Sequence, residues 1–247
     1  MNKVFINSIP RSGTHLAMRI ISLLPGLKRG VACPGKYPYL SINHSKEELR
    51  QTLNAINSGG YLCGHVMYSP QIYNELNEFR VKTIQVIRDP RDVIVSTAFF
   101  IEKYTQHLHH DHFIKIPFLT SRLELLINGS DPGELFPRIP SIDEYYKGMK
   151  PWTSEGNALV IRFENLVGPK GGGSFEKQRG EIEKIINNLG IELESEEISK
   201  ICLMAYDTSH TSFRNGQVGN WKEYFTKSLS KKFNDVAGDI LQEWGYI

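Results

Sequence analysis

The N-terminal stretch KVFINSIPRSGTHLAMRIISLL, residues 3–24, constrains the fold more than any other part of the chain. Residues 4–6 are a short apolar run with β-branched side chains, and residues 10–14 form a turn that contains one glycine. Residues 16–24 then carry apolar side chains at helical spacing. The stretch therefore predicts a strand, a tight loop and a helix in direct succession.

Such a junction is suited to an anion. The first backbone N–H groups of a helix lack intrahelical partners, and the helix dipole adds partial positive charge at the same place. Gly13 allows close backbone approach to a phosphate, Ser12 and Thr14 supply hydroxyls, and Arg11 brings a permanent charge. The alternative is an ordinary strand-to-helix turn with a Ser or Thr cap.

The loop differs from the loop that binds magnesium–triphosphate, whose pattern G-x-x-x-x-G-K-[ST] places a lysine directly after its second glycine. Here Gly13 is followed by Thr14 and His15, and position 8 holds serine instead of the first glycine. We interpret the loop as one that binds a phosphate but not a magnesium-bound triphosphate.

Composition sets broad limits. The 247 residues, 40% hydrophobic and 23% charged, predict a single α/β domain over residues 1–247 with a buried core. A net charge of +2 gives no reason to expect nucleic acid or an anionic membrane as the main partner. The sequence has neither a spanning apolar run nor a signal-peptide pattern, and its three scattered cysteines argue against disulfides or a zinc site. We expect a cytoplasmic protein without an integral membrane segment.

Three further strands are expected, at residues 61–67, 82–87 and 158–161, and a helical pattern follows each of them. This alternation predicts a P-loop-like three-layer α/β fold, in which helices flank a central parallel sheet. The expected helices include one at 45–57 with a Ser45/Glu48 capping box. The others cover residues 73–79, 93–100, 181–189, 194–204 and 229–244.

Two of these strands end in residues that suggest chemistry. His65 lies at the end of its strand, where open α/β sheets bind ligands, and a neutral imidazole there can take a proton from an alcohol. The alternative for His65 is a structural, partly buried histidine. Arg88 ends the next strand, and both Arg88 and Ser96 in the following helix could reach one anion.

The charges between Arg88 and Ser96 have a simpler interpretation. Asp89, Arg91 and Asp92 fit helix-start charges and surface ion pairs.

Residues 104–150 are the least regular region, and we interpret them as a lid or an acceptor-specificity insert. Residues 107–126 carry enough apolar side chains for a helix, and residues 130–140 form a Gly/Pro-rich connector. Half of the histidines fall in the run His107, His109, His110 and His112, but the run lacks the spacing of a metal site, so no metal is expected.

Two glycine-rich segments follow. Residues 171–173 are compatible with a flexible linker or with a loop that closes over a ligand. Residues 212–226 carry Gly216, Gly219, Phe213 and Trp221 beside two basic side chains, which suits a loop that binds a phosphate. The alternative for residues 212–226 is a surface turn before the last helix.

Three motifs occur in a fixed order: PRSGTHL at residues 10–16, RDPRDVIVS at 88–96 and FRNGQVGNWKEYFT at 213–226. Together they resemble the nucleotide-binding signature of the sulfotransferases that use 3′-phosphoadenosine 5′-phosphosulfate (PAPS). RFENLVGPKGGGS, at residues 162–174, further resembles a pattern of bacterial-type members. The chain is thus similar to a cytosolic-type sulfotransferase domain of the bacterial kind.

The resemblance implies specific roles. Arg11 and His65 would be catalytic, with His65 as the general base, and the donor site would consist of Arg11, Ser12, Gly13, Thr14, His15, Arg88, Ser96, Phe213, Arg214, Asn215 and Gly216. The chain departs from the family pattern at four positions. Arg11 and Cys63 stand where lysines are common, Asn215 replaces a basic residue, and Leu16 replaces an adenine-stacking Trp.

The implied reaction is sulfuryl transfer to a hydroxyl or amine, with PAPS as co-substrate and 3′,5′-bisphosphoadenosine (PAP) as product. The acceptor would be a small molecule, a glycan or a lipid, and the reaction would need no metal. Two other functions stay open: a P-loop-type kinase or other phosphotransferase, and a non-catalytic nucleotide-binding or scaffolding protein.

Overall fold

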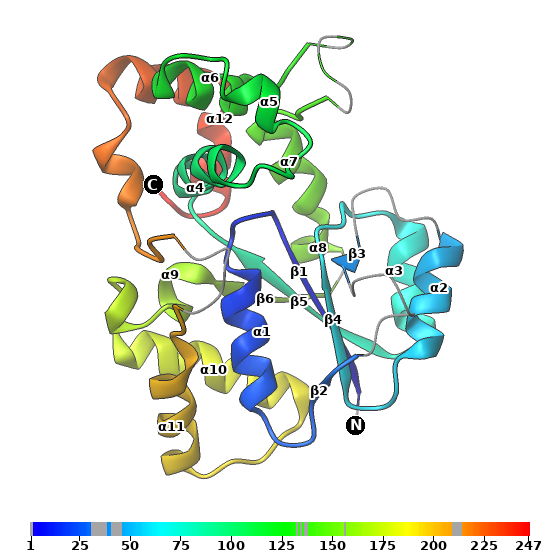
Figure 1. Cartoon of the computed structure of the whole chain (residues 1–247). Helices are drawn as coiled ribbons and strands as arrows, with labels where there is room; N and C mark the ends of the chain where they lie inside the picture. The colour runs from blue at the N-terminus through cyan, green and yellow to red at the C-terminus, as the bar shows by residue number, and fades with distance from the viewer. Residues whose placement is uncertain are drawn as a thin grey trace. The chain divides into compact units, whose positions relative to one another are not determined.

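Strand β1 (Lys3–Ser8) lies inside a parallel sheet in the computed structural model (Figure 1). The structure describes residues 2–30, 39–40, 46–131, 133, 135, 138–155, 157–208 and 214–247. In this part of the chain the sheet has six strands, in the order β2-β4-β1-β5-β6 with β3 also paired to β4. The other strands are β2 (Lys28–Arg29), β3 (Tyr39–Leu40), β4 (Gly60–Gly64), β5 (Val81–Ile87) and β6 (Leu159–Arg162).

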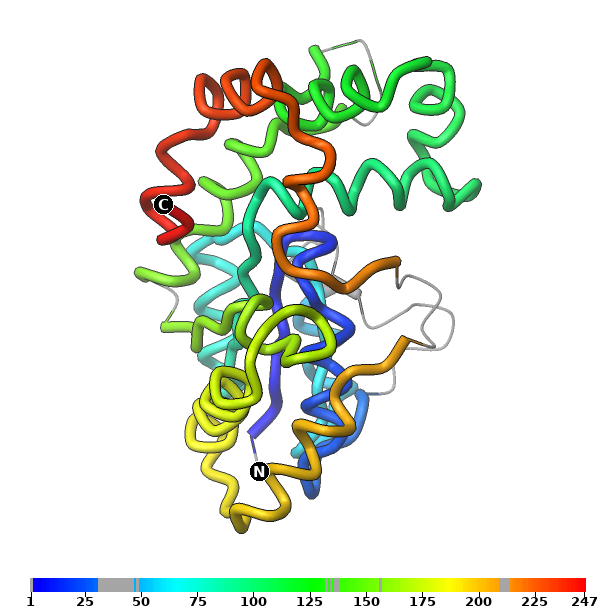
Figure 2. Tube along the Cα trace, turned by 90° about the vertical axis from the view of Figure 1, so that its left-hand side faces the viewer, coloured from blue at the N-terminus to red at the C-terminus, as the bar shows by residue number. Residues whose placement is uncertain are grey.

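Every strand pair is parallel, and β1 pairs with β4 on one side and β5 on the other. Because both faces of such a strand are covered, β1 reads as a continuous apolar run rather than as an alternating one. Val4, Phe5 and Ile6 are all fully buried. Figure 2 shows the chain leaving β1, turning back and entering the helix that lies beside it.

One face of the sheet is covered by α1 (Thr14–Leu23), α10 (Phe175–Leu189) and α11 (Ser195–Ala205). Their apolar sides meet Val4 and Ile6 in the main hydrophobic cluster. Helix α10 ends at Gly190, whose φ of 66° is a left-handed conformation that glycine adopts without steric cost.

The opposite face carries α2 (Lys46–Ala55), α3 (Pro70–Glu78) and the short helix α8 (Pro151–Ser154). Trp152 of α8 is fully buried and packs edge-on against Phe5, with ring centroids 6.2 Å apart. The sheet is therefore the middle of three layers. These elements, with α9 (Phe163–Leu166) and the 3₁₀ turn η1 (Pro169–Gly171), make up a first compact unit of residues 1–88 and 149–217.

Residues 89–148 and 218–247 form a second compact unit. Its described residues contain helices and no strand: α4 (Pro90–Lys103), α5 (His110–Phe113), α6 (Leu119–Asn128), α7 (Ile142–Met149), the 3₁₀ turn η2 (Asn220–Glu223) and α12 (Lys227–Glu243). Helix α6 packs against both α4 and α12. Tyr146 of α7 packs edge-on against Trp244.

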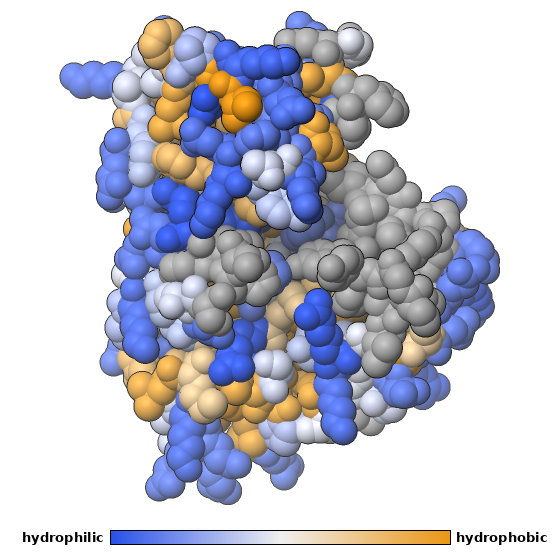
Figure 3. All heavy atoms as spheres, in the orientation of Figure 1, coloured by the Kyte–Doolittle hydropathy of each residue, from blue (hydrophilic) through white to orange (hydrophobic). Residues whose placement is uncertain are grey.

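Large apolar side chains reach the surface of this second unit around α5. Tyr104 is 47% exposed, Leu108 64%, Ile114 44% and Phe118 68%. Figure 3 shows hydrophobic residues among hydrophilic ones in the region of α5 and α6. None of the helices described has both the length and the apolar character to span a membrane.

The predicted strands and the central parallel sheet are confirmed, and the expected helices at 73–79, 93–100, 181–189, 194–204 and 229–244 correspond to α3, α4, α10, α11 and α12. The single helix expected at 107–126 is wrong. The chain forms α5 and α6 instead, because Pro117 cannot donate the helical N–H bond and disfavours a helical conformation in the residue before it. Ser45 and the Glu48 side chain, the expected capping box, lie outside the described residues.

The glycines at 171–173 belong to a packed turn rather than a linker. Gly171 is buried, and a Cβ there would lie 2.1 Å from Val167 Cγ2 and 2.6 Å from the carbonyl oxygen of Gly216. No larger residue fits this position without moving the backbone.

The histidine run adjoins α5. His109 is only 8% exposed, its backbone N–H donates to Nδ1 of His107 at 3.2 Å, and the two rings lie 5.6 Å apart. Burial lowers the pKa of His109 to about 4, with smaller contributions from the neighbouring His107 and His112. The folded state therefore favours the neutral imidazole.

We expect His109 to make the protein acid-labile. A group whose pKa is lower in the folded state contributes stability that is present above pH 6.5 and lost as the pH falls toward 4. Urea unfolding at pH 7, 5.5 and 4.5 should show a smaller fall in the free energy of unfolding for His109→Gln than for the wild type. His112→Gln, in the helix that begins directly after His109, is the control. An equal fall in the wild type and His109→Gln would contradict the assignment.

Candidate functional site

The sheet brings the candidate residues together at the carboxyl ends of its strands. The loop of residues 9–13 follows β1, His65 follows β4, Arg88 follows β5 and Phe163 follows β6. Because all the strands are parallel, these four ends share one edge of the sheet, which is where ligands bind in open α/β folds.

The loop after β1 has an unusual backbone. Ser12 N–H donates to the carbonyl of Ile9 at 3.1 Å, and Arg11 has a φ of 72°, in the left-handed region that few non-glycine residues occupy. Gly13 has a φ of 103° and precedes α1 without offering a side chain to cap it. A Cβ on Gly13 would lie 2.6 Å from Cδ2 of Phe163, so both conformation and space require glycine there.

Two hydroxyls lie within this loop. The Oγ of Ser12 is buried and has no hydrogen-bond partner among the described residues, an arrangement that costs free energy. Thr14 Oγ1 lies 2.6 Å from Ser8 Oγ. An oxygen-rich anion would provide the acceptor that Ser12 lacks, so the donors of this loop fit a phosphate or sulfate group.

His65 is held by the strand that leads into the loop. Its Nδ1 lies 2.8 Å from the carbonyl oxygen of Ser8 and 3.4 Å from Ser8 Oγ. A carbonyl only accepts hydrogen bonds, so Nδ1 carries the proton and the ring's lone pair lies on Nε2. His65 therefore has the tautomer that a general base needs.

The environment also keeps His65 neutral. Burial lowers the pKa of His65 below 6.5, and the positive charge of Arg11 lowers it further, while the bond to the Ser8 carbonyl opposes both effects. The residue as a whole is nonetheless of intermediate exposure. An imidazole that is neutral at physiological pH can accept a proton from a bound hydroxyl.

Arg88 connects the loop with the late motif. Its Nη1 donates to the carbonyl of Arg11 and its Nη2 to the carbonyl of Gln217, both at 3.0 Å. Its guanidinium carbon lies 4.1 Å from the ring centroid of Phe163, and the residue is 7% exposed. A guanidinium has several N–H groups and can donate to more than one acceptor. That Arg88 also contacts an anion stays a prediction.

The late motif contributes residues 214–217 to the first unit. The carbonyl of Asn215 accepts a bond from the Tyr206 hydroxyl at 3.4 Å, and Gln217 Nε2 donates to the carbonyl of Lys170 at 2.9 Å. Gly216 has a φ of 63°, and it lies against the buried Gly171. Phe213, the first residue of the motif, lies outside the described residues.

Not all of the predicted site residues belong to the first compact unit. His15 lies in the first turn of α1, one residue beyond Thr14. Ser96 is buried on α4 in the second unit. That Ser96 shares an anion with Arg88 stays a prediction.

Asp92 is not the surface ion-pair residue that the sequence suggests. It is 1% exposed, and its two carboxylate oxygens accept the backbone N–H groups of Gly219 and Trp221, each at 2.8 Å. Apolar residues follow Asp92 directly in the sequence, and this was the available sign that the carboxylate is buried. The second half of the late motif is thus fastened to the start of α4.

The neighbouring charges Asp89 and Arg91 form a pair that is mostly buried. Asp89 Oδ1 accepts from the backbone N–H of Arg91 as a helix cap, so the expected helix-start role is confirmed. The Arg91 guanidinium pairs with Asp89 and lies 3.9 Å from the ring centroid of Trp221. The expectation of a surface ion pair is wrong, since the side chains are only 15% and 10% exposed.

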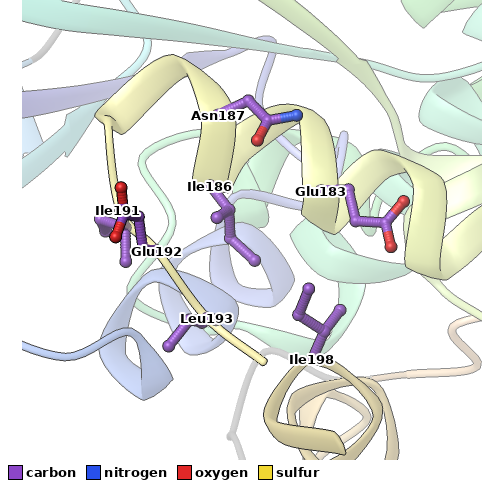
Figure 4. Close-up of a pocket in the computed structure, with 7 residues that line it drawn as sticks. All are labelled: Glu183, Ile186, Asn187, Ile191, Glu192, Leu193 and Ile198. Carbon is purple, nitrogen blue, oxygen red and sulfur yellow. The ribbon is translucent and has the colours of Figure 1, made fainter. Parts of the chain in front are cut away.

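A separate hollow of about 360 Å³ lies between α10 and α11. Figure 4 shows Ile186, Leu193 and Ile198 around the space between the two helices, with Glu183, Asn187, Ile191 and Glu192 completing the lining. None of these residues carries a predicted role in the chemistry. Among the described residues no three His, Cys, Asp or Glu side chains converge as metal ligands.

Known proteins resemble this chain along nearly its full length. A Cavia porcellus 3-beta-hydroxysteroid sulfotransferase is 23% identical, over 92% of this chain and 79% of the relative. Sulfotransferase 2A2 of Rattus norvegicus is 24% identical, over 94% and 82%.

Solved structures share the fold. Mouse sulfotransferase SULT7A1, complexed with PAP, has a TM-score of 0.68 at 18% identity, over 98% of this chain and 85% of that one. Retinol dehydratase in a complex with retinol and PAP has a TM-score of 0.63 at 17% identity, over 98% and 82%. The predicted P-loop-like fold is confirmed. The family model described as "Sulfotransferase domain" matches residues 1–245, and the chain therefore belongs to the sulfotransferase domain family.

Proposed function

We propose that this protein transfers a sulfuryl group from PAPS to a hydroxyl or amine of a small acceptor, with His65 as the general base. The observation that carries the proposal is the 2.8 Å bond between His65 Nδ1 and the carbonyl of Ser8. This bond holds the imidazole of His65 against the residue that precedes the loop proposed to bind the donor. Membership of the sulfotransferase domain family supports the same reaction.

The donor would occupy the edge of the sheet. Arg11, Ser12, Thr14 and the backbone N–H groups from Gly13 onward would hold the 5′-phosphosulfate, with His15 nearby in the first turn of α1. The 3′-phosphate would lie among Arg88, Ser96, Phe213, Arg214, Asn215 and Gly216. Arg88 and Arg214 would supply positive charge of the kind that magnesium supplies in kinases.

In the proposed reaction the acceptor oxygen or nitrogen forms a bond to sulfur while the bond from sulfur to the bridging phosphate oxygen breaks. His65 takes the acceptor's proton on Nε2. Arg11 and the N–H groups of Gly13 and Thr14 stabilise the charge that develops on the departing oxygen. Each such donor is worth about 3 kcal/mol of barrier.

The class of acceptor is open among small molecules, glycans and lipids. One relative is named for a 3-beta-hydroxysteroid, and one structural neighbour was crystallised with retinol. A first acceptor panel should therefore hold hydroxysteroids, retinol and simple phenols, assayed with radiolabelled PAPS. A P-loop-type kinase would instead bind magnesium–ATP, and a non-catalytic protein would bind PAP and turn nothing over.

Replacing His65 tests the base. His65→Gln keeps a donor near the Ser8 carbonyl but lacks a basic nitrogen, so we expect turnover to fall at least ~100-fold. The Kd for PAP, measured by calorimetry, should stay unchanged because the loop is intact. His112→Gln serves as the control for loss of an imidazole. Turnover that survives in His65→Gln would remove His65 from the mechanism.

The pH profile tests the same group independently. Because burial and Arg11 lower the pKa of His65 in the free protein, the acid limb of kcat/KM should have its midpoint below pH 6.5. A midpoint above pH 6.5 would mean that the imidazole is not the titrating base.

The late motif should depend on Asp92. Asp92→Asn replaces one carboxylate oxygen by an NH₂ group that faces a backbone N–H, so residues 219–221 lose a bond and gain a repulsion. We expect PAP to bind about 10-fold more weakly and the protein to lose about 1–3 kcal/mol of stability. Asp235→Asn on α12 is the control. Unchanged PAP binding would show that the late motif does not contact the donor.

A further inference from the structure

We propose that Asn7 is the positioning residue for His65. Its side chain fixes the peptide that follows His65 to strand β1 and so sets where the imidazole stands beside the phosphate loop. The catalytic consequence rests on the function proposed for His65, whereas the structural consequence does not.

The Asn7 side chain forms two hydrogen bonds with the backbone of Val66, the residue after His65. Its Oδ1 accepts the backbone N–H of Val66, and its Nδ2 donates to the carbonyl of the same residue, both at 2.9 Å. A side chain that binds both the N–H and the C=O of one residue fixes that residue's position and orientation. Asn7 is fully buried, and Val66 is 2% exposed, so water does not compete for these bonds.

The residue before His65 is also held by β1. Gly64 is the register partner of Asn7 in the parallel pairing of β1 with β4. His65 therefore lies between two residues that the same position of β1 holds, one by sheet pairing and one by the Asn7 side chain. The next residue of β1, Ser8, accepts the bond from the imidazole itself.

Asn7 is in turn fixed by its surroundings. Its Nδ2 also donates to Gln85 Oε1 at 2.9 Å, and Trp152 Nε1 donates to the Val66 carbonyl at 2.8 Å. Gln85 lies on β5 and Trp152 on α8, so one element holds the Asn7 side chain and another holds the Val66 carbonyl that Asn7 binds. The other buried positions of β1 up to Ile6 are apolar. Burying a polar network at Asn7 costs desolvation free energy, and its hydrogen bonds fix the orientation of the buried groups.

The chemical consequence follows from geometry. A base must stand within hydrogen-bond reach of the acceptor's proton, and a misplacement of about 1 Å can cost about 100-fold in rate. Strand β1 leads into the loop that would hold the donor and also carries Asn7 and Ser8, which bind Val66 and the imidazole of His65. Asn7 thus keeps His65 at a fixed position relative to the proposed donor site.

The kinetic test compares two variants at this position. Asn7→Asp keeps an acceptor for Val66 N–H but turns an oxygen toward the Val66 carbonyl, and Asn7→Ala removes every bond. Both should lower kcat about 100-fold while leaving the Kd for PAP unchanged. Ile161→Ala, in the same sheet core and away from these bonds, is the control for lost stability. Equal losses in Ile161→Ala and the Asn7 variants would overturn the proposal.

A second readout needs no substrate. With ¹³C-labelled histidine, the His65 resonance is the one missing from His65→Gln, and its titration reports the ring's surroundings. In the Asn7 variants we expect the pKa of His65 to rise toward 6.5, because a ring that is no longer held gains water; Arg11, the charged neighbour, stays in place. An unchanged His65 titration in a folded Asn7 variant would refute the positioning role, even if the wild type transferred no sulfate. Absence of PAP binding by the wild type would refute the proposed function alone.

Discussion

The hydrogen bond from His65 Nδ1 to the carbonyl of Ser8 is the contact on which the rest of the site depends. It joins the ends of two neighbouring parallel strands, sets the tautomer of the imidazole and holds the ring against Ser8, the residue that precedes the loop. The sheet makes this contact possible, because β1 lies between β4 and β5 and its carboxyl end is surrounded by theirs. The buried strand β1 thereby positions both the loop and His65, the proposed base.

Two buried charged side chains, those of Arg88 and Asp92, bind the backbone of the late motif. Arg88 spans from the loop to the late motif through two backbone carbonyls, and Asp92 holds the continuation of that motif through two backbone N–H groups. Each charge is matched by backbone dipoles rather than by an opposite charge alone. Removing either partner of such a contact leaves a desolvated polar group, so these residues are costly to replace.

The sequence predicts the parts of this protein that follow from local periodicity and loop chemistry. Strand β1, the glycine loop and the position of His65 at a strand end were all accessible, because apolar runs and turn residues report them directly. The split at Pro117 follows from proline chemistry and not from the apolar spacing of residues 107–126, which predicts one helix. The roles of Asn7 and Asp92 were not accessible, because they depend on which distant backbone groups the fold brings to these side chains.

Calorimetric titration with PAP, with ADP in parallel, tests the central claim most directly. ADP lacks the 3′-phosphate, so the pair isolates the contacts attributed to Arg88 and the late motif from those of the loop. We predict that PAP binds the wild type at least ~10-fold more tightly than ADP, and that Arg88→Ala removes most of this difference. Equal affinity for PAP and ADP, or tighter binding of magnesium–ATP than of PAP, would contradict the account.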